Sequence, residues 1–178
     1  KNNDWEDLTI DPYGNLFIAD CGNNRNDRTN LSIIQLSLKN ALEKDSLWAK
    51  SLPFHYANQN EFPPPKEQLD FDCESVYWQN DSIYLVTKSR AEPWKGLASI
   101  YVLPANGKSQ LAVKRYEIMI GNDGWWNDAV TAADMVHDTL ILLTYQRMLY
   151  FTNVSTKFQL LDSYVFKDID QKESIVCK

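Results

Sequence analysis

The stretch WEDLTIDPYGNLFIAD, residues 5–20, contains the pattern that decides the fold. Two short apolar-rich segments, residues 6–10 and 16–20, flank the sequence Asp11-Pro12-Tyr13-Gly14-Asn15. Proline, glycine, asparagine and aspartate are the residues that tight turns prefer, each for its own backbone reason. Two short strands around such a turn predict a β-hairpin.

The start of this hairpin recurs along the chain. The equivalent segments begin with a small or acidic pair and then enter an apolar-rich strand; they are residues 6–10, 74–78, 133–137 and 173–177. After each of the first three, a turn and a second strand follow, at residues 16–20, 83–88 and 139–145. We predict third strands at 32–36, 99–103 and 148–151, and fourth strands at 50–56, 111–118 and 160–166.

Repeated units of four antiparallel strands are typical of β-propellers. The sequence therefore predicts an all-β fold, a β-propeller segment of about three four-stranded antiparallel blades plus the first strand of the next. The predicted units cover residues 5–72, 73–131 and 132–170, and the next blade starts at 171. The first two units carry insertions at 58–71 and 120–128, which we expect on one face of the propeller.

Only one short helix, at residues 39–44, interrupts the predicted strands, so an α/β fold is excluded. A closed propeller needs about four to eight blades. We therefore expect the remaining blades to come from the same longer chain, with pairing to another chain as the alternative. The first residue is Lys1 rather than methionine, which suggests a mature or excised segment.

Composition excludes several functional classes. The net charge is −6 and no lysine or arginine cluster stands out, so we expect no nucleic-acid partner. No apolar run approaches the ~20 residues that a membrane-spanning helix requires. The three cysteines, Cys21, Cys73 and Cys177, are odd in number and irregularly spaced, which fits neither a disulfide framework nor a zinc site.

Three segments resemble a known group of proteins. Residues 4–24 with the sequence DWEDLTIDPYGNLFIADCGNN, residues 71–75 and residues 130–134 are similar to uncharacterised secreted bacterial β-propellers of the Bacteroidetes type. More distantly, they resemble phytase-like and esterase-like propellers. The resemblance implies a secreted, periplasmic or cell-surface location in a bacterium. It says little about activity, because a fold hosts many functions.

The repeated strand starts would place acidic side chains in a ring around the channel. In a propeller the first strand of each blade lines the axis, and the acidic residues at these positions are Glu6, Asp7, Glu74, Asp134 and Glu173. Hard oxygen ligands of this kind suit Ca²⁺ or Mg²⁺, and we expect Ca²⁺ as the candidate cofactor. The alternative is structural: these carboxylates accept backbone N–H groups from the neighbouring blade and lock the blades together.

A second set of polar residues lies at or just after the ends of the second strands: Asp20, Lys88, Arg90, Tyr145 and Arg147. Because Lys88 and Arg90 alternate along one strand, they share a side. With Arg147 they could hold an anion such as phosphate. The alternative is that the three cations pair with acidic side chains of the protein itself.

Two functions follow from these patterns. The first is a propeller binding or scaffold module for a small molecule, glycan or peptide at the channel mouth, where Trp125-Trp126 and Trp94 could stack on the ligand. The alternative for these tryptophans is that they cover the end of a core. The alternative is a metal-dependent phosphoester or ester hydrolase, with Glu74 as the catalytic residue, a metal ligand or general base. The sequence shows no complete catalytic set and no nucleophile elbow, so the binding module is favoured.

Overall fold

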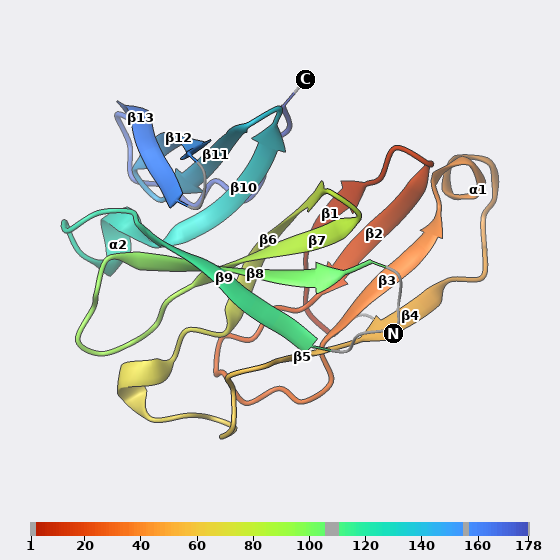
Figure 1. Ribbon diagram of the computed structural model, residues 1–178, viewed down its shortest axis with the longest axis horizontal. Helices are drawn as coiled ribbons and strands as arrows, with labels where there is room; N and C mark the ends of the chain where they lie inside the picture. Colours follow the sequence, from red (N-terminus) through yellow and green to blue (C-terminus); the bar gives the residue numbers. More distant parts are fainter. Residues whose placement is uncertain (1–2, 106–110, 155–156, 178) are drawn as a thin grey trace.

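The computed structural model describes residues 3–105, 111–154 and 157–177. In these residues the strands form three sheets, antiparallel except for one short edge strand, that fan out around one edge (Figure 1). The inner strands β1, β6 and β10 of the three sheets lie next to one another, β6 in the middle. The all-β propeller architecture predicted from the repeat is thereby confirmed.

The first sheet contains β1 (Trp5–Ile10), β2 (Asn15–Asp20), β3 (Ser32–Ser37) and β4 (Lys50–Pro53), in that order. The second sheet contains β6 (Asp72–Gln79), β7 (Ser82–Lys88), β8 (Leu97–Pro104), β9 (Leu111–Met119) and, at its outer edge, β5 (His55–Tyr56). The third sheet contains β10 (Val130–Val136), β11 (Thr139–Thr144), β12 (Arg147–Val154) and β13 (Lys157–Val165). Short helical segments are α1 (Leu38–Glu43), the 3₁₀ turn Lys66–Gln68 and α2 (Trp125–Asp128).

The hairpin turns explain why the inner strands reverse where the sequence predicts. In the first turn, the Asp11 carboxylate accepts the N–H groups of Tyr13 and Asn15 at 2.9 and 2.8 Å. Gly14 has φ +82°, a left-handed conformation that glycine adopts without steric cost. In the second turn Asn80 and Asp81 have φ values of +48° and +54°, the positive angles of the turns that suit hairpins.

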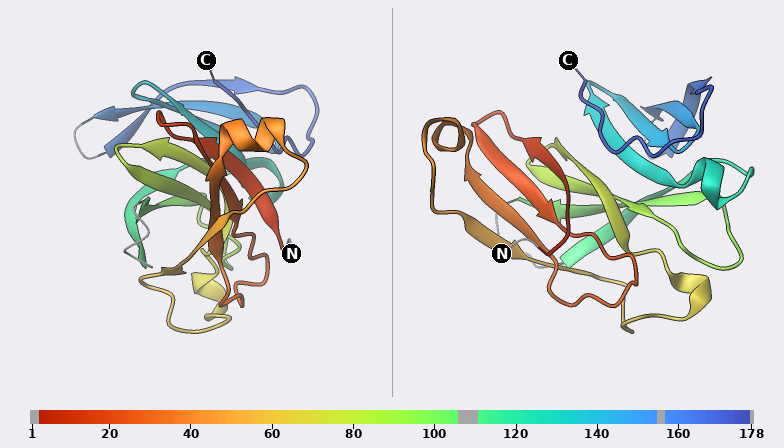
Figure 2. Two further views of the ribbon diagram at one scale, coloured as in Figure 1. Left: turned by 90° about the vertical axis from the view of Figure 1, so that its right-hand side faces the viewer. Right: turned by 180° about the vertical axis from the view of Figure 1, so that it is seen from behind.

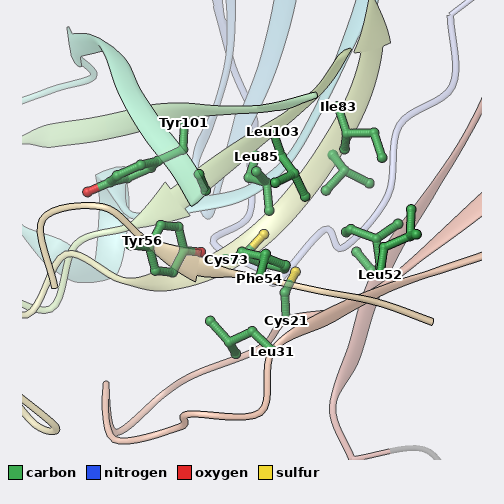
Figure 3. Packing of buried hydrophobic residues seen from close by; sticks show 14 of the residues in the cluster. Cys21, Leu31, Leu52, Phe54, Tyr56, Cys73, Ile83, Leu85, Tyr101 and Leu103 are labelled. Carbon is green, nitrogen blue, oxygen red and sulfur yellow. The ribbon is translucent and has the colours of Figure 1, made fainter. Parts of the chain in front are cut away.

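The core consists of two apolar layers between neighbouring sheets. Figure 3 shows the layer between the first and second sheets, where Leu52, Phe54 and Cys21 meet Leu85 and other side chains of the second sheet. A second layer fills the space between the second and third sheets, including Val86, Ile100 and Leu142. Both faces of the second sheet are therefore buried, as in a blade with a neighbour on each side.

Two predicted strands differ from the structure. The predicted fourth strand 50–56 is divided: β4 ends at Pro53, and β5 pairs in parallel with β9 of the second sheet. The buried Phe54 lies between them and donates its N–H to the Leu31 carbonyl at 3.0 Å, so the chain crosses from one sheet to the next there. Residues 171–177, predicted to begin a further blade, form no strand in the structure, and the Cys177 N–H donates to the Asp134 carboxylate at 2.8 Å.

Candidate functional site at the channel mouth

Four of the five acidic positions predicted for the channel separate into two groups, and Asp134 lies within β10 rather than at its start. The fifth, Glu173, is exposed and accepts a hydrogen bond from the Gln171 amide at 2.7 Å. Asp7 accepts hydrogen bonds from the Ser75 hydroxyl and, at 2.9 Å, from the Val76 N–H of the next sheet. Asp134 accepts the Cys177 N–H at 2.8 Å. These two carboxylates thus bind backbone groups of the following segment, which is the structural arrangement that the sequence left open.

Glu6 and Glu74 form the other group, near the ends of the sheets where the insertions lie. Glu74 is almost fully buried, and its Oε1 lies 2.9 Å from the Nζ of Lys88, whose side chain is only 2% exposed. Glu6 is half-buried, and the charges of Asp4, Asp72, Lys88 and Glu173 all act on it. A single buried cation therefore faces several carboxylates at this mouth.

Aromatic rings enclose the other side of the lysine. The Lys88 ammonium lies 5.5 Å from the Trp125 ring centre and 5.4 Å from that of Tyr145, both within cation–π range. Trp125 is fixed because its indole N–H donates to the Ser89 carbonyl at 3.0 Å. Tyr145 and Trp125, both named in the sequence analysis, therefore meet at one lysine.

The cations predicted to bind an anion are each paired within the protein. Arg90 donates its Nε to Asp72 at 2.7 Å and also binds Asn24. Arg147 binds the fully buried Asp128. Together with the Lys88–Glu74 pair, these contacts match the alternative of internal charge pairing.

Asp20, the acidic residue predicted at the ends of the second strands, does not pair with Lys88 or Arg90. Burial would raise its pKa, but hydrogen bonds from the Asp4 N–H and from Arg28 hold the pKa of Asp20 below its ordinary value. The Arg28–Asp20 distance is 3.0 Å. Asp20 thus anchors the loop after β2 to the first residues of the chain.

Sequence reasoning missed the carboxylate partners Asp72 and Asp128. Each is buried, and each binds both an arginine and a backbone N–H, of Asn23 at 2.8 Å for Asp72 and of Asp123 at 2.7 Å for Asp128. Their position could have indicated this role. Each aspartate lies at or just before the first residue of an inner strand, and an arginine follows the second strand of the same hairpin.

No convergent metal cluster is found in the part of the chain that the structure describes: no group of three or more His, Cys, Asp or Glu side chains is arranged to hold a metal ion. The predicted Ca²⁺ site with Glu6, Asp7, Glu74, Asp134 and Glu173 stays a prediction. A melting temperature that rises with added Ca²⁺ and falls with EDTA would support it.

The stability of the protein should depend on pH because of the buried carboxyl groups at this mouth. Burial and the charges of Asp4 and Asp72 raise the pKa of Glu6 to about 7, although Lys88 opposes them. Burial, and next the charge of Asp72, also raise the pKa of Glu74 above its ordinary range. At pH values between the ordinary pKa of glutamate and these raised pKa values, the folded protein therefore binds more protons than the unfolded chain.

We expect the contribution of Glu6 to the free energy of unfolding to be largest below about pH 4.5 and to be lost as the pH rises through about 7. Urea denaturation at several pH values between these limits measures the slope. Glu6→Gln, which cannot ionise, should flatten it. An unchanged slope in Glu6→Gln would show that Glu6 has an ordinary pKa.

A pocket next to this mouth is lined by three tryptophans and two charged side chains. Its volume is about 410 Å³, and its lining residues are Arg90, Ala91, Glu92, Trp94, Trp125 and Trp126. Trp126 is 72% exposed. The two segments that form it, the loop 90–94 and the first residues of α2, are at the same end of the sheets (Figure 2).

A second cavity, of about 590 Å³, lies along the inner strands. It is lined by β1, by Ile18 of β2, by Val76, Ala133 and Asp134, and by residues 173–177. This is the channel side of the three sheets. The two cavities share no lining residue.

Comparisons with known proteins identify no family: no family model and no curated protein matches the chain. Among solved structures it is similar to Sqt1 of Saccharomyces cerevisiae, with 15% identity over 90% of this chain and 35% of that one, at a TM-score of 0.46. It is also similar to the glutaminyl cyclase of Myxococcus xanthus, with 14% identity over 93% of this chain and 52% of that one, at a TM-score of 0.44.

The chain therefore spans about a third of the first structure and about half of the second. At these TM-scores the likenesses carry no argument about function, and the propeller assignment rests on the three sheets themselves. The resemblance to secreted bacterial propellers stays a prediction. Among the described residues, no helix has the length and hydrophobicity that crossing a membrane requires.

Proposed function

We propose that this chain is a β-propeller binding module that holds a glycan in the pocket between Trp94, Trp125 and Trp126. The observation that carries this proposal is the pocket itself, which combines exposed indole surface with the anchored Arg90 and the exposed Glu92. Small-ligand sites are concave, mostly apolar and lined by a few placed polar groups. This pocket fits that description.

The lining is held in place before any ligand arrives. Trp125 is fixed by its hydrogen bond to Ser89, and the Arg90 guanidinium lies 5.3 Å from the Trp125 ring centre while Asp72 holds its Nε. Trp126 packs edge-on against Trp125, with ring centres 4.9 Å apart. A preorganised site loses less conformational entropy on binding.

A glycan matches this chemistry better than a purely apolar ligand. The C–H faces of a sugar ring can stack on the flat, exposed indole of Trp126, while its hydroxyls hydrogen-bond to charged groups at the rim. The Glu92 carboxylate can accept a hydrogen bond from a sugar hydroxyl, and the Arg90 guanidinium can donate one to it. An aromatic ring also supplies a large apolar contact area for one side chain.

Trp126→Ala is the decisive variant. We expect it to weaken binding of a matching oligosaccharide at least about tenfold, a loss of about 1.4 kcal/mol, because the stacking surface disappears. Tryptophan fluorescence titration and calorimetry with an oligosaccharide panel measure this. The matched control is Trp48→Ala, since Trp48 is 99% exposed and does not line the pocket.

Two results would contradict the proposal. If Trp126→Ala leaves oligosaccharide binding unchanged, the glycan binds at another site. If the protein binds peptides and no oligosaccharide, the ligand class proposed here is wrong. The hydrolase alternative is not favoured, because Glu74 is almost buried and paired with Lys88. Turnover of p-nitrophenyl phosphate or acetate that Glu74→Gln abolishes would establish that alternative instead.

A further inference from the structure

Two of the three cysteines meet between the first and second sheets. Cys21 directly follows β2, and Cys73 is the second residue of β6. Both side chains are 0% exposed and belong to the same apolar layer. Figure 3 shows their sulfur atoms next to each other, and a side-chain hydrogen bond joins the two thiols. Strands of different sheets, far apart in the sequence, therefore bring two thiols into direct contact.

Hydrogen bonds between the two sheets fix the backbone on both sides of this pair. On one side, the Asn23 N–H donates to the Asp72 carboxylate at 2.8 Å, and the Asn23 amide donates to the Phe71 carbonyl at 3.2 Å. On the other side, the Val76 N–H donates to the Asp7 carboxylate at 2.9 Å. Moving the two cysteines apart would break these contacts. The fold thus holds the pair in the close approach that a disulfide bond requires.

The third cysteine lies in different surroundings. Cys177 is partly exposed, and its N–H donates to the Asp134 carboxylate. In the described part of the chain, no group of three His, Cys, Asp or Glu side chains is arranged to hold a metal, whereas a structural zinc site takes four ligands. The odd number of cysteines therefore divides into one buried pair in contact and one separate thiol.

We propose that Cys21 and Cys73 form a disulfide bond under oxidising conditions, which links the first sheet covalently to the second. The bond closes a loop of about 50 residues, and a cross-link of this kind stabilises a fold chiefly by restricting the unfolded chain. The spacing of the cysteines in the sequence did not predict it, because the two positions become neighbours only when the first sheet packs on the second.

The oxidant is a low-molecular-weight disulfide such as oxidised glutathione. The thiolate of one cysteine attacks a glutathione sulfur, which forms a mixed disulfide and releases one glutathione thiolate. The thiolate of the other cysteine then attacks the cysteine sulfur of the mixed disulfide and releases the second glutathione. The two cysteine protons pass to the released thiolates, so two thiols are oxidised while one glutathione disulfide is reduced.

The folded protein limits access to this pair. Both sulfurs are buried, and burial raises the pKa of both thiols, so the thiolate that must attack is scarce. We therefore expect the bond to form while the chain folds, before the layer between the sheets closes. Oxidised glutathione added to the folded, reduced protein should produce the bond much more slowly than refolding in its presence.

The test is refolding of the urea-unfolded, reduced chain in a buffer of reduced and oxidised glutathione. Free thiols are counted by alkylation in urea, and mass spectrometry of the peptides locates the bond. We expect one free thiol, at Cys177, and a disulfide between the other two cysteines. The oxidised protein should melt at least about 5 °C above protein refolded in dithiothreitol.

Cys73→Ala should abolish this difference in melting temperature, and the matched control Cys177→Ala should keep it. Each variant is compared with itself under the two conditions, so a general loss of stability in Cys73→Ala does not imitate the result. Three free thiols after refolding, or a bond that includes Cys177, would overturn the proposal. An oxidised wild type that melts no higher than the reduced one would overturn it too, because the native contact would then not accommodate the bond.

Discussion

At about pH 9, above the raised pKa of about 8 of Glu74, replacing Lys88 by methionine is expected to lower the free energy of unfolding by about 3–5 kcal/mol, the usual result of removing one partner of a buried ion pair. Lys88 is 2% exposed and its Nζ lies 2.9 Å from Glu74. Without it, the buried Glu74 carboxylate has no cation beside it and stays close to the charges of Asp72 and Glu6. Methionine has a similar length, so the packing against Trp125 and Tyr145 is largely kept.

The double variant Lys88→Met/Glu74→Leu separates charge from packing. We expect it to recover most of the loss, because replacing both ions of a buried pair by apolar residues is often neutral. Urea denaturation of the wild type, both single variants and the double variant measures the cycle. A double variant as unstable as Lys88→Met would mean that packing, and not an unpaired carboxylate, causes the loss.

Asp72→Ala is the second change with a large expected effect, again about 3–5 kcal/mol. The Asp72 carboxylate is 0% exposed, lies 2.7 Å from Arg90 Nε and accepts the N–H of Asn23 at 2.8 Å. Its removal leaves a partly buried guanidinium and a buried N–H without their acceptor. Because Asn23 lies in the loop between β2 and β3 of the first sheet, this contact ties the first two sheets together.

Glu92→Ala is the matched control for this charge removal. Glu92 pairs with Lys66 at 3.4 Å, but both side chains are more than 70% exposed. Surface pairs contribute about 0–1 kcal/mol, so this variant should stay within that range of the wild type. The two variants can be compared by thermal and urea denaturation. Equal losses would contradict the role assigned to Asp72.

The strand repeat could be predicted because its causes are local. Alternation of apolar residues and the turn chemistry around Asp11 and Gly14 act within a few residues, and the hairpins form where these signals lie. Trp125 and Trp126 were also recognisable from their position in an insertion. The strand end at Pro53 was not predicted, because the buried Phe54 beyond it fits a site between two sheets that no local pattern describes.

Local patterns in the amino-acid sequence were enough to predict the hairpins and the order of the strands within each sheet. The partners of the charged residues depend on the fold, because Asp72 and Arg90, or Asp7 and the Val76 N–H, become neighbours when strands pair and sheets stack. Stacking also decided which apolar side chains are buried: Leu85 and Ile18 occupy the same register position, but only Leu85 is covered by another sheet. The physical reason is that burial depends on the neighbouring sheet and not on the strand itself.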